Sequence, residues 1–188
     1  MKTDIFALPI ESFNEVAALE LVIAPNKALN TAVPVLTELT EDAAQLVKRM
    51  AKTMYLHGGV GLAGNQVVVD SPIRAVVFDP LLKKVNGAPL ADPHVIFNPE
   101  IVQASEEGEV EEGCLSFPSV FLKKKRAGRV VVRGRDINWE EREIEAYGLT
   151  ATILQHEIDH LNGTTMVDGL SVLKRTNIMR KVKKALKS

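Results

Sequence analysis

The sequence predicts a single α+β domain, in which antiparallel or mixed sheets surround a central helix that carries an HExxH motif. Its 188 residues are 46% hydrophobic, which is enough for one full core and too few for two large domains. Segments typical of strands come before residue 148, and a strongly periodic helix follows them. Strands and helices therefore do not alternate as they do in a doubly wound sheet.

Composition limits the class of protein. The net charge of −1 argues against a general nucleic-acid binder, and we expect no DNA partner. No apolar run approaches the roughly 18 residues that span a bilayer, and the N-terminus lacks the basic-then-apolar order of an export signal. The single cysteine excludes an internal disulfide and suits a reducing compartment. We therefore expect a cytoplasmic enzyme with no membrane partner.

The first third of the chain is expected to contain one helix. Residues 1–20 are a weakly patterned lead-in, and residues 21–23 are predicted to form a short strand that Pro25 stops. From Thr40, a suitable N-cap, apolar residues recur at helical spacing until Gly58-Gly59 ends the helix. Residues 59–66 are rich in glycine, which predicts a loop whose backbone can approach another group closely.

The middle of the chain carries the strand predictions. Strands are expected over residues 73–78 and 95–97, the second ending before Asn98-Pro99. Residues 101–105 are expected to pair with the segment around 109–111. A strand over 130–132 is expected to form a hairpin with the alternating segment 142–147, through a turn near 136–140.

Two helices are predicted after the strands. The first spans about 149–162, with Gly163 just past its end as the C-cap. The second lies near 174–186 and combines many basic residues with an apolar stripe at Ile178, Val182 and Leu186.

Candidate metal ligands lie on the first of these helices. His156 and His160 are four residues apart and therefore share one helix face, where two imidazoles can bind one ion. The adjacent Glu157 can take a proton from a water that the ion activates. Cys114 is the third candidate ligand, because two imidazoles and one thiolate leave a tetrahedral ion one open position for hydrolysis. A thiolate also admits softer metals, including ferrous iron.

Other interpretations of these residues stay open at this point. HExxH alone also fits a solvated helix face, and a lone cysteine is more often a small buried apolar residue. A metallopeptidase or another metal amidohydrolase would use the same ligand set. A regulatory or structural metal module would close the fourth position, for which His57 and His94 are the only other histidines.

Three motifs, in this order, make the chain resemble the peptide deformylase family. They are Gly59-Val60-Gly61-Leu62-Ala63-Gly64-Asn65-Gln66, then Glu112-Gly113-Cys114-Leu115-Ser116, then Gln155 through Gly163. The resemblance extends to Ile96-Phe97-Asn98-Pro99 and Arg126, and it runs from about Leu21 to the C-terminus. It implies one catalytic domain over residues 1–188, with a divergent lead-in over residues 1–20. The chain departs from the family at Gly64, where alanine is usual, and we expect this glycine to loosen the loop.

The resemblance implies a hydrolase that removes the N-formyl group from the N-terminal formyl-methionine of nascent polypeptides and releases formate. Cys114, His156 and His160 would hold one divalent ion, Fe²⁺ in the cell, which Zn²⁺, Ni²⁺ or Co²⁺ can replace. Glu157 would act as the base and then protonate the departing amine. The side-chain amide of Gln66 and the backbone N–H of Leu115 would stabilise the oxyanion that develops on the formyl oxygen.

The resemblance also implies how the peptide is bound. The walls of an apolar pocket for the methionine side chain would be Val60, Val110, Leu149 and Ile153, although each alone would also suit plain core. The peptide backbone would add a strand between Val60-Gly61 and the edge at Glu112-Gly113. Arg126 would either pair with Glu112 or a loop carbonyl, or belong to a solvated basic turn. Asp159 is interpreted as a structural carboxylate.

The basic C-terminal helix, residues 174–187, has two interpretations. It either docks on the surface through its apolar stripe alone or contacts ribosomal RNA near the exit of nascent chains. The ribosome is therefore a candidate partner beside the N-formyl-methionyl peptide.

Overall fold

The computed structural model describes residues 6–8, 16–80, 84–85, 88–89 and 92–187. The main sheet contains β1 (Gly61–Ala63), β2 (Ala75–Phe78), β5 (His94–Gly113), β6 (Phe121–Arg135) and β7 (Glu141–Tyr147), hydrogen-bonded in the order β1-β2-β5-β6-β7. All of its strand pairs are antiparallel. A separate two-stranded ladder joins β3 (Lys84–Val85) to β4 (Ala88–Pro89).

The described helices are α1 (Glu41–Leu56), α2 (Gly148–Leu161) and α3 (Val172–Ala185), with short 3-10 turns η3 (Lys27–Asn30) and η4 (Gly64–Gln66). Thr40 caps α1 as predicted, because its hydroxyl accepts a hydrogen bond from the Ala43 N–H. Gly58 and Gly163 follow the ends of α1 and α2 with φ of +67° and +74°, a conformation that glycine adopts without strain. The antiparallel sheet with its helices confirms the predicted α+β class.

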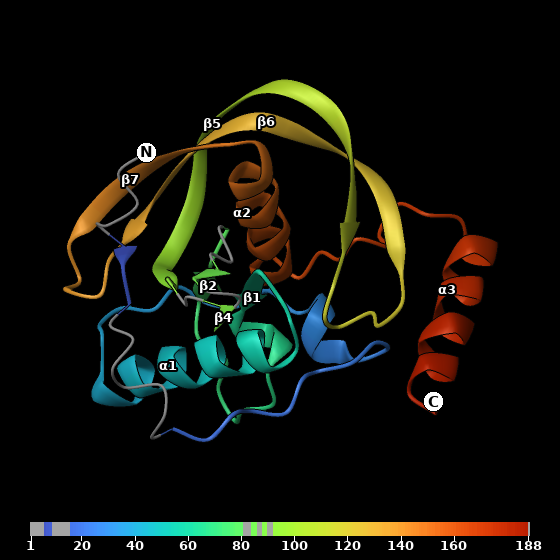
Figure 1. Ribbon diagram of the computed structural model, residues 1–188, viewed down its shortest axis with the longest axis horizontal. Helices are drawn as coiled ribbons and strands as arrows, with labels where there is room; N and C mark the ends of the chain where they lie inside the picture. The colour runs from blue at the N-terminus through green and yellow to red at the C-terminus, as the bar shows by residue number, and fades with distance from the viewer. Residues whose placement is uncertain (1–5, 9–15, 81–83, 86–87, 90–91, 188) are drawn as a thin grey trace.

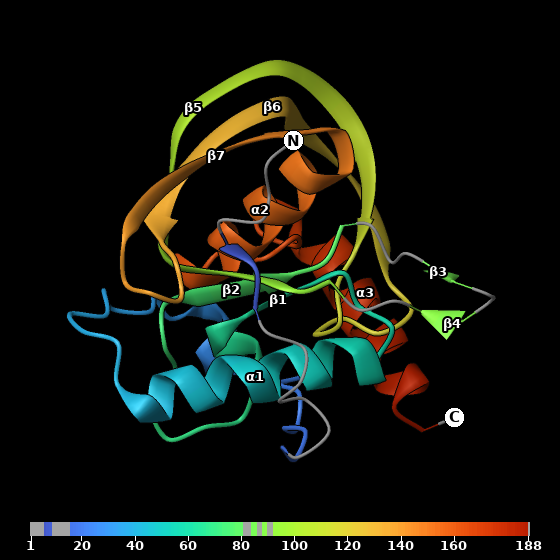
Figure 2. The same ribbon diagram turned by 60° about the vertical axis from the view of Figure 1, so that its left-hand side comes forward.

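The sheet separates two apolar layers. Figure 1 shows α2 inside the arch that β5 and β6 form, while α1 lies across β1 and β2 on the far side. Because successive strand residues face opposite ways, Val76 of β2 packs in the α2 layer and Val77 in the α1 layer. Both faces of β2 are therefore buried, which explains why its sequence is apolar throughout. Figure 2 shows the same stacking from another side.

The prediction for residues 95–111 is wrong in one respect. Residues 95–97, 101–105 and 109–111 all belong to β5, which passes through Asn98-Pro99 without ending. Residues 101–105 and 109–111 both pair with β6, not with each other. Asn98 has φ of 49° and the register shifts between Phe97 and Glu100, so a bulge accommodates the proline that lacks an N–H.

Two further predictions need correction. Residues 21–23 form no strand, and only an isolated bridge joins Leu21 to Val67. The glycine-rich run is not an irregular loop, since it contains β1 and η4. Pairing with β2 and complete burial of Leu62 stabilise β1 in spite of its glycine. Gly64 is buried, and a Cβ there would overlap the Ile73 carbonyl oxygen, so this glycine allows close packing and does not loosen the run.

The ends of the chain differ in how they are held. Most of the lead-in over residues 1–20 lies outside the described residues. At the other end, Ile178 and Val182 of α3 are buried in a cluster that contains Phe117 and Val120 of the loop between β5 and β6. Two residues of the predicted apolar stripe therefore dock, whereas the third, Leu186, follows the end of the helix and is 59% exposed. Within the described ranges, no helix has the length and apolar character needed to cross a membrane.

Candidate active site

The three predicted metal ligands meet at one point of the fold. His156 and His160 lie on successive turns of α2, and Cys114 follows the last residue of β5. Their ligand atoms all lie within 4.8 Å of one another, and Cys114 Sγ is 3.2 Å from His160 Nε2. Two imidazoles and one thiol at this spacing fit a tetrahedral divalent ion with a fourth position left for another ligand.

The two ligand histidines have opposite electrostatic environments. Burial opposes a proton on His156, yet Cys114 and Glu112 outweigh it and raise the pKa of His156 well above its usual value. Burial lowers the pKa of His160, so this imidazole stays neutral, as a metal ligand must be. Cys114 and Glu112 thus favour positive charge at His156, and a cation bound there would have to displace its proton.

Glu157 lies buried beside the ligands. Burial raises the pKa of Glu157 to about 7, so its carboxyl group can take up and release a proton near neutral pH. In the described part of the chain, Glu157 Oε2 has no hydrogen-bond partner. A Cβ on Gly61 would lie only 2.5 Å from Glu157 Oε1, so this glycine leaves room for the carboxylate. A buried, unpartnered oxygen at this place suits a proton acceptor for a reacting water.

A buried ion-pair network stands behind His156. Glu112 Oε1 lies 3.4 Å from His156 Nδ1, and Glu112 accepts two hydrogen bonds of 3.0 Å from Arg126. Arg126 also donates to Asp159 Oδ2 at 2.6 Å. Although Glu112 is buried, the hydrogen bonds from His156 and Arg126 lower its pKa to about 2. Pairing of Arg126 with Glu112 is thus confirmed, and the solvated basic turn is wrong because Arg126 is buried.

Sequence reasoning missed that Glu112 turns toward His156. It placed Glu112 at the edge for the peptide and identified no acceptor for the histidine ring. The signal was the alternation of the strand: Glu112 and Val110 share one face of β5, between exposed neighbours on the other. An acidic residue on an inward strand position requires a buried partner, and Arg126 occupies an inward position of β6.

Gln66 is held with its amide nitrogen toward the ligands. Its Oε1 accepts a hydrogen bond of 2.7 Å from the Ala63 N–H, which fixes the orientation of the amide. Its Nε2 then lies 3.2 Å from Ser116 Oγ and 3.4 Å from Cys114 Sγ. The backbone N–H of Leu115 has no hydrogen-bond partner among the described residues. Two donors are thus available near Cys114.

A cavity of about 520 Å³ opens onto these groups. Eight of the predicted site residues line it: Val60, Gly61, Gln66, Gly113, Cys114, Leu115, His156 and Glu157. The rim of the cavity also contains His57, Pro118, Ser119 and Phe121. The cavity therefore connects the candidate catalytic groups to solvent.

Five predicted site residues are not part of the cavity lining. His160 lies deeper, as a ligand at the back of the site. The Glu112 side chain is buried and accepts hydrogen bonds from Arg126. Ile153 is buried behind Gly61, where a Cβ would lie 2.8 Å from its Cγ2 atom. Leu149, in the first turn of α2, is 57% exposed, and Val110 is half-buried on the inner face of β5.

The non-enzyme interpretation required a further histidine in the metal group. Within the described ranges, the only group of potential ligands is Cys114, His156 and His160, and neither His57 nor His94 belongs to it. His94, the first residue of β5, is buried against Phe78 of β2. His57 lies on the cavity rim. The geometry therefore favours an open catalytic site over a closed structural one.

Comparisons with known proteins show the family of the chain. The polypeptide deformylase family model matches residues 18–176. A peptide deformylase of Bradyrhizobium diazoefficiens is 40% identical over 169 residues, which cover 89% of this chain and 96% of the relative. The Legionella pneumophila peptide deformylase structure has a TM-score of 0.82 and 37% identity, covering 91% of this chain and 96% of that one. An Ehrlichia chaffeensis peptide deformylase, solved in complex with actinonin, has a TM-score of 0.80 and 37% identity, covering 92% and 100%. The chain belongs to the polypeptide deformylase family.

Proposed function

We propose that Cys114, His156 and His160 hold one divalent metal ion, and that Glu157 uses it to hydrolyse a formamide bond. As a family member, the chain is a hydrolase that removes the N-formyl group from the N-terminal formyl-methionine of nascent polypeptides and releases formate. The observation that carries the assignment of residues is the cluster of three ligand side chains, two of which, Cys114 and His156, line the same cavity as the buried Glu157. We place this activity in the cytoplasm, where nascent chains are made.

The residues divide the chemistry among them. When bound, the ion acts as a Lewis acid that polarises the formyl carbonyl and activates the attacking water. Glu157 takes the proton of that water and returns it to the departing amine. The amide N–H of Gln66 and the backbone N–H of Leu115 donate to the oxygen on which negative charge develops. Ferrous iron is the ion we propose, because a thiolate ligand admits softer metals, with zinc, nickel or cobalt as substitutes.

The peptide is proposed to enter as an added strand. β1 and the end of β5 border the cavity at Gly61 and Gly113, and both lack side chains that would block a third backbone. The methionine side chain would point inward to Val60 and Ile153, with Val110 and Leu149 as the remaining walls. Burying a thioether side chain contributes about 1.5–3 kcal/mol, which favours methionine without excluding leucine-like residues.

Three tripeptides test this function. Anaerobically prepared protein with a measured metal content is given formyl-, acetyl- and free-amine Met-Ala-Ser. We expect formate from the first, and neither acetate nor peptide-bond cleavage from the others. Cleavage of the Met–Ala bond would instead indicate a metallopeptidase. Glu157→Ala should keep the metal and abolish formate release, and turnover by this variant would overturn the role of Glu157.

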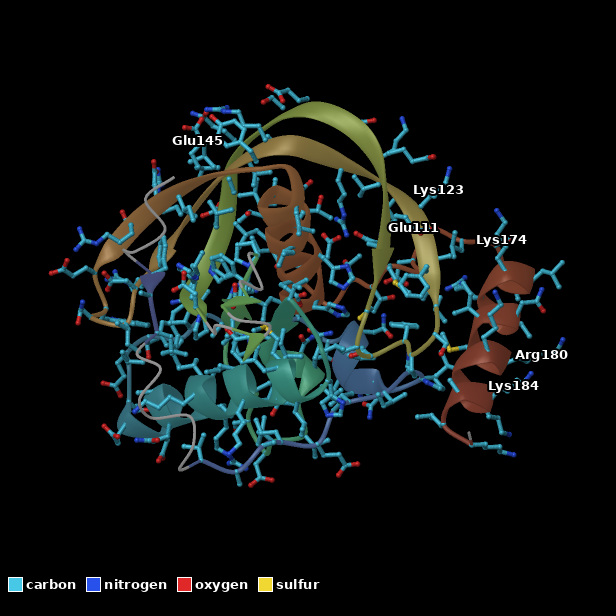
Figure 3. All side chains as sticks on the ribbon, viewed as in Figure 1. Glu111, Lys123, Glu145, Lys174, Arg180 and Lys184 are labelled. Carbon is cyan, nitrogen blue, oxygen red and sulfur yellow. The ribbon has the colours of Figure 1, made fainter. Side chains whose placement is uncertain are left out.

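We also propose that α3 contacts ribosomal RNA. The helix carries Lys174, Arg175, Arg180, Lys181, Lys183 and Lys184 and no acidic residue. Lys174, Arg180 and Lys184 are exposed, and Figure 3 shows them on α3 at the edge of the molecule. Phosphate groups are the partners that such a surface attracts, with an affinity that falls as salt rises.

Charge reversal tests this contact better than truncation, because removing α3 would also uncover Phe117 and Val120. The variant Arg180→Glu with Lys184→Glu should lose co-sedimentation with ribosomes at low salt. Its control, Lys123→Glu with Lys125→Glu, makes the same charge change on the exposed face of β6. Equal co-sedimentation of the α3 variant and the parent would reject the contact.

A further inference from the structure

Phe121 is a large aromatic side chain at the mouth of the cavity that has no part in the proposed chemistry. It lines the cavity yet remains 67% exposed. It is the first residue of β6 and pairs with Gly113, the last residue of β5. A Cβ on Gly113 would lie 2.9 Å from Phe121 Cε1, so the ring lies across the bare backbone of that glycine. A flat apolar surface therefore borders the site.

The two faces of this ladder differ in character. Glu112 is buried on the inner face, toward His156, whereas its neighbour Gly113 is exposed on the outer face. Residues directly opposite each other in an antiparallel pair share a face, so Phe121 lies on the outer face with Gly113. In Figure 1 this end of the ladder is the limb of the arch that descends toward α3.

The second edge of β5 is open near Gly113. β5 pairs with β2 only from His94 to Phe97, and over residues 108–113 its one strand partner in the described part of the chain is β6. A substrate strand on that edge would extend the ladder. If its methionine side chain points inward, the side chain of the following residue must point to the outer face. There it reaches Gly113 and the Phe121 ring.

We propose that Phe121 selects the residue that follows formyl-methionine, favouring an aromatic or branched aliphatic side chain. This inference rests on the proposed function and specifies its substrate. Cross-strand aromatic and β-branched pairs stabilise a ladder beyond the contribution of alanine, and the exposed ring has surface left to bury. We expect formyl-Met-Phe-Ser to be cleaved with a kcat/KM about fivefold higher than formyl-Met-Ala-Ser, a ratio that such a pair supports.

The experiment measures this ratio in the parent and in three variants of the full chain. Phe121→Ala removes the ring, and we expect the Phe/Ala ratio to fall to near one. Phe121→Leu keeps an apolar surface and should retain an intermediate ratio. Leu173→Ala removes a side chain that is 71% exposed on α3, so the ratio should equal that of the parent. Thermal unfolding of each variant shows whether the fold is kept.

The possible results distinguish failure of the proposed role of Phe121 from failure of the proposed deformylase activity. Formate release with the parent ratio retained in Phe121→Ala would overturn the role of Phe121 and leave the deformylase activity standing. A parent ratio near one would do the same, because the ring would then only cover Gly113. Formate release from neither peptide would overturn the proposed function and this inference with it.

Discussion

The carboxylate of Glu112 lies 3.4 Å from His156 Nδ1 and is held in place by Arg126. The ring is thereby oriented so that its other nitrogen faces Cys114 and His160. A carboxylate in this position fixes the tautomer of a ligating histidine and raises its basicity. Glu112 thus acts through His156 and not on the substrate, which makes it a positioning residue.

Replacing Glu112 should weaken metal binding. Glu112→Gln keeps the size of the side chain but removes its charge, so it leaves Arg126 with only Asp159 as an ionic partner. We expect metal affinity to fall 10–100-fold, measured by competition with a chelator. The free energy of unfolding should fall by less than the roughly 3–5 kcal/mol expected for a wholly unpaired buried charge, because Arg126 keeps Asp159.

The matched control for this change is Glu111→Gln. Glu111 is the residue of β5 just before Glu112, but it is exposed on the outer face. Its substitution should change neither the metal affinity measured by competition with a chelator nor the free energy of unfolding, within the error of the measurements on the parent. Equal effects of the two substitutions would show that the Glu112 carboxylate does not position His156.

The substitution Gly61→Ala should displace the carboxylate of Glu157, the proposed base, without removing it. The Cβ of Gly61→Ala would lie 2.5 Å from Glu157 Oε1 and 2.8 Å from Ile153 Cγ2, so Glu157 must shift. A displacement of about 1 Å at a reacting group can cost on the order of 10²-fold in rate. We expect kcat for formate release to fall by that order while the metal content stays unchanged.

Gly108→Ala is the control for that variant. A Cβ at Gly108 would meet nothing within 4 Å, and the residue lies in β5 of the same sheet but does not line the cavity. Formate release by Gly108→Ala should equal that of the parent. If Gly61→Ala were equally active, the room beside Glu157 would not matter to the reaction.

Gln66 should contribute to kcat much more than to substrate binding. Gln66→Met keeps the length of the side chain and removes the N–H that points toward Cys114. Loss of one oxyanion donor costs about 10²–10³ in kcat. We expect that fall with little change in KM, and Ser116→Ala, which removes only a neighbour of the Gln66 amide, should change kcat far less. A change confined to KM would contradict an oxyanion role.

Much of the site was predictable because its chemistry depends on local spacing. Helical periodicity alone places His156 and His160 on one face of α2. The chemistry of a third ligand indicated Cys114, and the family resemblance indicated Gln66, before any contact was known. The environment of Glu112 was not predictable in this way, since it depends on how β5 and β6 are paired along their full length.

The strand errors have a common physical origin. Asn98-Pro99 indicates a strand end locally, because proline donates no hydrogen bond to a ladder. Thirteen paired positions between β5 and β6 outweigh that local preference, and the chain bulges at Asn98 and continues. β1 likewise forms from a glycine-containing segment, because β2 supplies the hydrogen bonds and α1 and α2 cover its two faces. Tertiary pairing thus overrides propensity where a segment is buried.

Alkaline pH should destabilise the fold through Tyr55. Burial raises the pKa of Tyr55 well above its usual value, and the hydrogen bond of 2.7 Å to Asp79 raises it further. In the unfolded chain this phenol ionises near pH 10, while in the folded chain it stays protonated. The stability that this difference contributes is fully present below about pH 10 and is lost as pH rises above it, by about 1.4 kcal/mol per pH unit.

Tyr55→Phe isolates this contribution. The variant should be less stable than the parent at pH 8, because Asp79 loses a donor, but its unfolding free energy should decline less steeply above pH 10. Tyr147→Phe is the matched control, since this second tyrosine is 50% exposed. Urea unfolding between pH 8 and 11 measures all three slopes. A parent and a Tyr55→Phe variant with the same slope would mean that Tyr55 ionises as readily in the folded chain as in the unfolded one.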